Sequence, residues 1–275
     1  MGLFSLFTKK RTVKDARNGG REVICIFKEK DKIEINEKEY SYIGEWKNDT
    51  RWGYGKEILK KEGYPSSISG NWIQDQTYEG QWQNDKYHGE GTLTFGNGDV
   101  FKGDFRYGNQ NGKGTHRFAN GDLYVGDFAF GKFEGTGKLT FTNGKSYEGE
   151  FVGGEFNGKG KLICADGLVY EGEFKNSEFH GFGVATSPSG STLEGNFKKG
   201  LLNGKGKLTH PDGETYEGNF SQGTYFGKGK LTLSNGVVFS GNWTDLHNAT
   251  EVTKKEGTKK TKGKILNGAF IPDPE

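Results

Sequence analysis

The stretch Tyr147-Glu-Gly-Glu-Phe-Val-Gly-Gly-Glu-Phe-Asn-Gly-Lys-Gly-Lys-Leu-Ile-Cys-Ala-Asp-Gly-Leu-Val169 is one copy of a 23-residue unit that decides the fold. The start of the unit, a tyrosine or substitute with glycine at +2 and an aromatic residue at +4, recurs without any insertion. A fixed period of this length is the sequence signature of a repeat architecture. The unit starts at Tyr78, Phe101, Tyr124, Tyr147, Tyr170, Leu193 and Tyr216, and an eighth copy begins at Phe239 and breaks off.

Each unit is predicted to consist of two antiparallel strands. Its first five residues alternate, so Tyr147, Gly149 and Phe151 point to one face of a strand and the glutamates between them to the other. A second strand is expected from Gly158 to Cys164. Glycines occupy +2, +11, +13 and +20 in all seven units. The first three leave room beside the aromatic rings, which lets the sheet twist and coil strongly.

The turns are predicted from glycine-containing pairs. An Asn-Gly, Asp-Gly or Ser-Gly pair, such as Asn97-Gly98, closes every unit. Such a pair is a strong signal for a tight hairpin, because both residues can take positive φ. The other link, such as 152–157, is expected to be a longer turn. The predicted fold class is therefore all-β: an elongated, twisted, single-layer antiparallel β-meander of hairpin repeats.

Two local features of the repeats lead to further expectations. Glutamates at +1 and +3 are expected to pair with lysines at +12 and +14 across strands, for about 0.2–1 kcal/mol each. The unit from Tyr170 carries Ser187-Pro188 where other units have an apolar residue. Because proline cannot donate a ladder hydrogen bond, we expect a local bulge or weak point between Tyr170 and Leu193.

The combined pattern resembles the MORN repeat (membrane occupation and recognition nexus). The resemblance covers 78–243, and degenerate copies precede it at Tyr42–Trp46 with Gly53–Gly55 and at Ile68–Trp72, where the register slips. It implies a cytoskeletal, ciliary or cortical scaffold, or a membrane-tethering module.

The chain is expected to divide into four segments. These are a basic tail with capping strands at 1–41, degenerate repeats at 42–77, the regular repeats with a partial eighth at 78–243, and a basic tail with a capping strand at 244–275. An open meander has two edges that must be paired or capped, and the capping strands are sought in 21–27, 33–46 and 261–270. The same edges make a homodimer or larger assembly an expectation.

Composition excludes several classes of protein. Residues 78–243 hold 17 Lys and Arg against 19 Asp and Glu, so the repeats lack the basic surface of a nucleic-acid-binding domain. The two cysteines, Cys25 and Cys164, lie in unrelated contexts, which favours no disulfide and a reducing, cytoplasmic location. No apolar run approaches the roughly 20 residues of a membrane-spanning helix.

No chemistry-bearing motif stands out. Gly-x-Gly is not followed by a helix, as a phosphate-binding loop requires. His88 and His180 share an offset but lie four repeats apart, and no Cys/His spacing matches a zinc site. The paired glutamates form a repeated ladder, whereas catalytic acids need distinct environments. We therefore expect a protein that is not an enzyme, without cofactor or metal.

The aromatic ribbon is the candidate binding site. We expect a scaffold that holds a helix or extended segment of a protein partner in an aromatic and glycine groove. The groove residues are predicted to be Tyr124, Phe128, Tyr147, Phe151, Tyr170, Phe174, Tyr216 and Phe220.

The N-terminus supports an alternative, a tether that binds anionic lipids through the basic termini. Its lipid-contact residues would be Leu3, Phe4, Leu6, Phe7, Lys9, Lys10 and Arg11. The same stretch also fits a docking arm or an organellar presequence.

Overall fold

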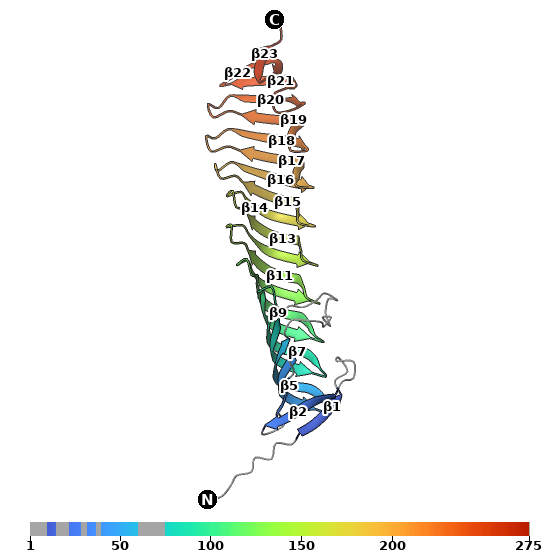
Figure 1. The fold of residues 1–275 in the computed structure, drawn as a ribbon. Coiled ribbons are helices and arrows are strands. Elements are labelled where there is room, and N and C mark those ends of the chain that lie inside the picture. The colour runs from blue at the N-terminus through green and yellow to red at the C-terminus, as the bar shows by residue number, and fades with distance from the viewer. Residues whose placement is uncertain (1–9, 15–21, 29–31, 37–39, 60–74, 275) are drawn as a thin grey trace, which may run out of the picture. The chain divides into compact units, whose positions relative to one another are not determined.

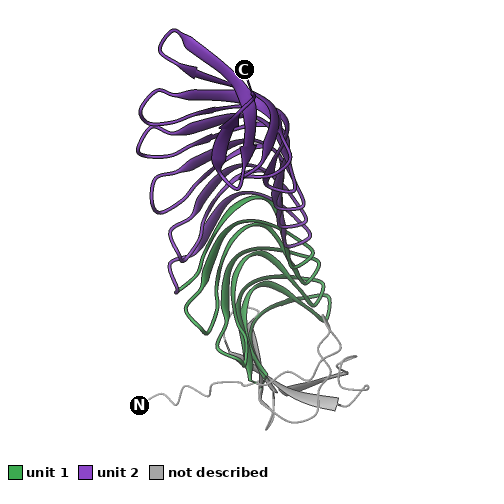
Figure 2. Ribbon diagram, turned by 90° about the horizontal axis from the view of Figure 1, so that it is seen from above, with its two compact units in different colours: residues 1–142 green, residues 143–275 purple. Residues whose placement is uncertain are grey.

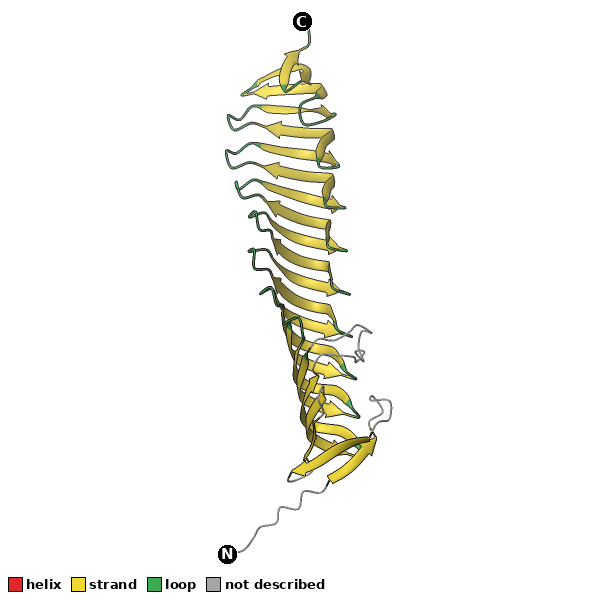
Figure 3. Ribbon diagram, viewed as in Figure 1, coloured by secondary structure: helices red, strands yellow, loops and turns green. Residues whose placement is uncertain are grey.

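The computed structural model describes residues 10–14, 22–28, 32–36, 40–59 and 75–274, with side chains from Ser41 onward. Contacts divide the chain into two compact units, residues 1–142 and 143–275, which are treated separately (Figure 2). None of the described residues is helical (Figure 3). The prediction of an all-β meander of antiparallel hairpin repeats is confirmed within each unit.

In the first unit, every strand pairs antiparallel with its neighbours in the chain (Figure 1). The strands are β1 (Lys10–Lys14), β2 (Glu22–Lys28), β3 (Lys32–Asn36), β4 (Tyr40–Lys47), β5 (Thr50–Leu59), β6 (Gln76–Gln83), β7 (Lys86–Thr94), β8 (Val100–Arg106), β9 (Asn109–Arg117), β10 (Leu123–Ala129) and β11 (Lys132–Thr140).

The second unit repeats this plan (Figure 1). Its strands are β12 (Ser146–Val152), β13 (Glu155–Ile163), β14 (Val169–Lys175), β15 (Glu178–Thr186), β16 (Thr192–Lys198), β17 (Leu201–Thr209), β18 (Thr215–Ser221), β19 (Thr224–Thr232), β20 (Val238–Trp243), β21 (Ala249–Glu256), β22 (Lys259–Leu266) and β23 (Ala269–Pro272). The tail that was searched for a capping strand thus contributes β22 and β23, whereas the degenerate copy at Ile68–Trp72 lies outside the described residues.

The two kinds of turn are the reverse of the prediction. The tight turn lies inside each repeat: Val152 pairs with Glu155, and Gly153 and Gly154 between them have φ of 61° and 96°. Positive φ at both central residues defines the type I′ hairpin. The Asn-Gly pair instead ends a three-residue loop, in which Gly98 alone has positive φ (93°) and donates to the Phe95 carbonyl at 2.9 Å. Asn97 accepts a hydrogen bond from the Asp99 N–H at 3.0 Å, which stabilises the loop.

Pro188 itself causes no bulge, and the weak point expected in this repeat stays a prediction. The proline lies beyond the end of β15, in a turn that Gly190 N–H closes onto the Ser187 carbonyl at 2.9 Å. This is position i+1 of the turn, where the fixed φ of proline is favoured and no ladder donor is required. The register shift in this repeat falls at Gly172/Glu173, as it does at the matching Gly149/Glu150 of the preceding repeat.

The bulge explains the glycine at +11. Gly149 pairs with Gly160 and Glu150 with Asn157, so Gly158 and Lys159 are extra residues on β13. Gly158 has φ of 57°, a conformation that glycine adopts at little cost. The Glu150 carboxylate accepts the Lys159 N–H at 2.9 Å, so this acid stabilises the bulge.

In the regular repeats that begin with an aromatic residue, the core is a ring packed against two glycines, at +2 and +13, which we call the glycine floor. Tyr147 is fully buried, and its ring stacks on Phe156 at 3.8 Å and meets Phe151 edge-on at 5.1 Å. A Cβ added at Gly160 would lie 2.6 Å from Cζ of Tyr147, and one at Gly149 would lie 2.6 Å from the Gly160 Cα. Ring pairs of this kind contribute about 0.5–1.5 kcal/mol beyond area burial. The glycines at +2 and +13 therefore let a single sheet bury its own rings.

Candidate functional site

The eight predicted groove residues are all buried. Their exposed fractions run from 0 to 4%, in Tyr124, Phe128, Tyr147, Phe151, Tyr170, Phe174, Tyr216 and Phe220. Their faces are covered by neighbouring rings: Tyr147, for example, also meets Phe174 of the next repeat edge-on at 5.0 Å. These rings are core residues, and a partner in the groove would reach the residues that border them. We call the side of the sheet that carries them the ring face.

The accessible part of the ring face in the first unit is an aromatic strip near the three-residue loops. Phe95, His116 and Phe118 are all only half-buried. The His116 ring stacks on Phe95 at 5.8 Å and lies 4.4 Å from Phe118, which meets Phe133 edge-on at 6.3 Å. We call Phe95, His116 and Phe118 the ring-face strip. Its rings form a row of aromatic contacts that joins two neighbouring repeats.

An aspartate fixes one end of this strip. Asp99 accepts the Ala119 N–H of the next loop at 2.8 Å, and its other oxygen lies 3.4 Å from Nε2 of His116. Burial by itself raises the pKa of Asp99, and the hydrogen bonds from Ala119, Asn97 and His116 outweigh it, so the pKa lies below the ordinary value. The strip is thus held by a carboxylate that stays ionised at neutral pH.

The ring at +9 is a core position that sequence reasoning missed. Of the seven regular units five begin with tyrosine, and in all five the +9 residue is aromatic and stacks on that tyrosine at 3.6–3.8 Å. The units that begin with Phe101 and Leu193 carry Gln110 and Leu202 there instead. This paired variation between +0 and +9 was present in the sequence and could have identified the contact.

A buried polar cluster was also missed. Arg51 and Glu57 are 1% and 2% exposed and form an ion pair. Arg51 Nε lies 3.1 Å from the Asp85 carboxylate, and the Tyr87 hydroxyl donates to Glu57 at 2.7 Å. Burial, and then the charge of Glu57, raise the pKa of the Tyr87 hydroxyl. We call Arg51, Glu57, Asp85 and Tyr87 the polar lock. It joins β5 to β7 and to the turn before β7, and its role is structural because its members bind one another.

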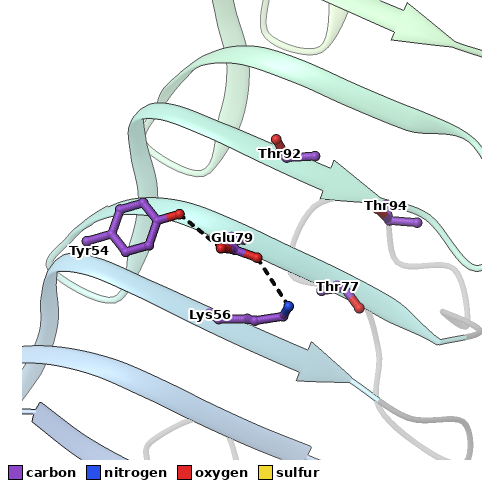
Figure 4. Close-up of a pocket in the computed structure, with 6 residues that line it drawn as sticks. All are labelled: Tyr54, Lys56, Thr77, Glu79, Thr92 and Thr94. Carbon is purple, nitrogen blue, oxygen red and sulfur yellow. Dashed lines mark hydrogen bonds and ion pairs between the residues drawn. The ribbon is translucent and has the colours of Figure 1, made fainter.

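The outer face carries a shallow pocket over β5–β7 (Figure 4). Its centre is Glu79, which accepts hydrogen bonds from Lys56 and from the Tyr54 hydroxyl, both at 3.1 Å. The hydrogen bond from Lys56 lowers the pKa of Glu79. A general acid requires the opposite shift. The rest of the lining, Thr77, Thr92 and Thr94, belongs to the cross-strand ladder of this face.

The predicted lipid-contact residues lie outside the part of the chain whose side chains the structure describes. Leu3, Phe4, Leu6, Phe7 and Lys9 lie outside the described residues, and Lys10 and Arg11 are described only as backbone of β1. In the part of the chain that the structure describes, no helix is long and apolar enough to cross a membrane. The same part contains no group of three or more His, Cys, Asp or Glu side chains that could hold a metal ion.

Comparison with solved structures gives only a distant likeness. The TCP domain of Drosophila melanogaster SAS-4, solved with a proline-rich motif of Ana2, matches at 14% identity and a TM-score of 0.33, over 80% of this chain and 95% of that one. The TCP10 domain of Danio rerio CPAP matches at 11% identity and a TM-score of 0.28, over 84% and 94%. TM-scores this low say nothing of what this chain binds. No curated protein matches the sequence.

The family model of the MORN repeat matches the chain eight times. The matches span residues 42–63, 78–100, 101–123, 124–146, 147–169, 170–192, 194–215 and 216–238. Seven of them fall on the seven regular units, six at the start read from the sequence and one at residue 194, one residue after Leu193. The first match covers the degenerate copy from Tyr42, which contributes Arg51 and Glu57 to the polar lock. The repeat is of a non-enzymatic type, and the chain belongs to the MORN repeat family.

Proposed function

We propose that this protein is a non-enzymatic scaffold that binds a segment of a protein partner along the ring face, in a cytoskeletal, ciliary or cortical assembly. The observation that carries the proposal is the ring-face strip. Its three rings lie side by side, half-buried, next to a fully buried core. Partly accessible aromatic residues are favoured at protein interfaces, where rings supply contact area at low entropic cost.

The strip also suits a segment more than a globular partner. It follows successive repeats, with Phe95 and Phe118 at the same offset of neighbouring units. Equivalent positions in neighbouring units are two strands apart, about 9.6 Å. A partner that lies along the strip would therefore place apolar side chains at regular intervals, as helices and extended segments do.

The test compares two variants of the full chain in affinity capture from native lysate, followed by mass spectrometry. Phe95→Ser with Phe118→Ser removes the apolar surface of the strip and should release the partner recovered with the wild-type chain. Thr92→Ser with Thr94→Ser alters the outer face and should retain it. Equal recovery by both variants would contradict the proposal. Recovery of anionic vesicles instead of a protein would favour the tether.

A further inference from the structure

Two exposed aromatic rings occupy turn positions where aromatic residues are unfavourable. Tyr107 and Phe130 are 62% and 78% exposed, and each is the first central residue of a type I′ turn, with φ of 54° and 50°. A left-handed conformation is unfavourable for a bulky side chain, and Asn-Gly is the preferred pair at such turns. Burial of the ring does not offset the unfavourable backbone conformation in either case, because both side chains are mostly exposed. An unfavourable residue that the fold does not need points to a role in binding.

The two turns are stacked along one edge of the first unit. The Gly108 N–H of the first turn donates to the Tyr87 carbonyl at 2.9 Å, and the Gly131 N–H of the second donates to the Gln110 carbonyl at 3.0 Å. Each tight turn thus rests on the second strand of the preceding repeat. Equivalent atoms of the two turns are consequently two strands apart, about 9.6 Å.

The surroundings of the rings are positively charged. The Arg106 guanidinium lies 5.3 Å from the centre of the Tyr107 ring, and the His88 ring meets Tyr107 edge-on at 6.2 Å. Lys86 and Lys132, which begin β7 and β11, are exposed beside the turns. The nearby Asp85 is already engaged by Arg51. The edge therefore offers two apolar rings and three cations to an acidic partner.

We infer that the turn edge formed by Tyr107, Phe130, Lys86, Arg106 and Lys132 docks an acidic segment in polyproline II conformation, with prolines three residues apart. Three residues of that conformation advance about 9.3 Å, close to the spacing of the two turns, whereas an α-helix presents the same face after about 10.5 Å. Prolines pack well on exposed aromatic rings, and the segment loses little entropy because it is already extended. This surface is separate from the ring-face strip, which begins near the three-residue loops.

The first test separates binding from folding. Tyr107→Asn with Phe130→Asn creates the favoured Asn-Gly pair at both turns, so the melting temperature of the full chain should rise or stay unchanged. A clear fall in melting temperature would show that the rings serve the fold and would overturn the inference. Gln222→Asn makes the same turn pair in the second unit, where no exposed ring is lost, and is the matched control.

The second test measures binding directly. The probe is a fluorescein-labelled 12-residue peptide with two prolines three apart and flanking glutamates, followed by fluorescence polarisation with the full chain. Binding should weaken at least tenfold in the double Asn variant and severalfold in Arg106→Gln with Lys132→Gln, and stay unchanged in Gln222→Asn. Peptides with prolines four apart or replaced by alanine should bind more weakly.

Several outcomes would overturn the inference: no binding of the probe, no preference for the three-residue spacing, a stronger response to a helical peptide, or ring-dependent binding to vesicles with 20% phosphatidylserine in place of the peptide. Failure here leaves the proposed function standing, because Phe95→Ser with Phe118→Ser tests a different surface. If the peptide binds the turn edge but Phe95→Ser with Phe118→Ser still captures the partner, the partner would bind at the turn edge and not on the ring face.

Discussion

The repeat from Tyr42 and the repeat from Tyr147 fill the same two core positions with opposite chemistry. At +9 and +15, the latter carries Phe156 and Leu162, both buried apolar residues. The former carries Arg51 and Glu57, a buried ion pair. In both repeats a flat group at +9 lies beside the tyrosine and a side chain at +15 lies opposite it. The two positions thus accept either apolar residues or a buried ion pair.

The guanidinium succeeds in this role because it is planar and its donors are engaged. Arg51 Cζ lies 3.9 Å from the centre of the Trp82 ring and 5.6 Å from that of Tyr42. Its N–H groups reach Glu57 and both the carboxylate and the carbonyl of Asp85. A guanidinium stacks on rings in a way that an ammonium cannot. Arg51 can thus replace the aromatic residue at +9 because Glu57 and Asp85 accept its hydrogen bonds.

The largest effect is expected from breaking the polar lock. Glu57→Ala removes the buried carboxylate that Arg51 and the Tyr87 hydroxyl share as an acceptor, which should lower the free energy of unfolding by about 3–5 kcal/mol. Urea denaturation measures this. Glu79→Ala, which removes an exposed carboxylate of the neighbouring strand, is the control and should cost no more than about 1 kcal/mol. Equal losses of unfolding free energy in Glu57→Ala and Glu79→Ala would contradict the buried character of the polar lock.

The glycine floor is the next most sensitive feature. Gly160→Ala sets a methyl group against the Tyr147 ring, and overpacking of this kind should cost about 1–3 kcal/mol. Gly149→Ala should behave alike, because its Cβ would meet the backbone of Gly160. Thermal unfolding of each variant measures the change. If both alanine variants were as stable as the wild-type chain, the sheet would have room for a methyl group beside the Tyr147 ring, which would contradict this account.

The hydroxyl of the stacked tyrosine should have a smaller effect. It donates to the Glu150 carbonyl at 2.9 Å, next to the bulge. Tyr147→Phe should therefore cost about 0.5–1.5 kcal/mol. The unit from Phe101 lacks this donor, although a Cβ at Gly114 would meet the Phe101 ring just as the other floors meet their tyrosines. Phe101→Tyr should stabilise the protein by a similar amount, and urea midpoints that move in the same direction for both variants would contradict this account.

Much of the fold could be predicted from the sequence, because the repeat shows each position several times. Tyr147, Gly149 and Phe151 were placed on one face by alternation alone. The turns were assigned the wrong way round because Asn-Gly fits both a two-residue turn and the end of a three-residue loop. The true tight turns carry varied pairs, from Asn84-Asp85 to Phe130-Gly131, which give no common signal.

The candidate site was harder to predict, for two physical reasons. The bulge at Gly158 inserts extra residues and breaks the alternation, so the parity that placed Tyr147 could not place Phe156. Burial depends on how the hairpins curve, which a strand pattern does not contain, so Tyr170 and Phe174 were expected to face a partner and instead cover each other. Arg51 and Glu57 look like ordinary surface charges in the sequence, and only the structure shows that they replace a ring and a leucine.

The most direct test of the central claim is a double-mutant cycle at the lock. Arg51→Phe, Glu57→Leu and the combined variant are compared with the wild-type chain by urea denaturation. Each single change removes one member of the buried ion pair and should lower the free energy of unfolding by several kcal/mol, on the order of 3–5 kcal/mol. The combined variant places the residues found in the Tyr147 repeat at both positions and leaves only the Tyr87 hydroxyl without its acceptor, so we predict a loss of stability well below the sum of the two single losses. A combined loss equal to the sum of the two single losses would contradict the account.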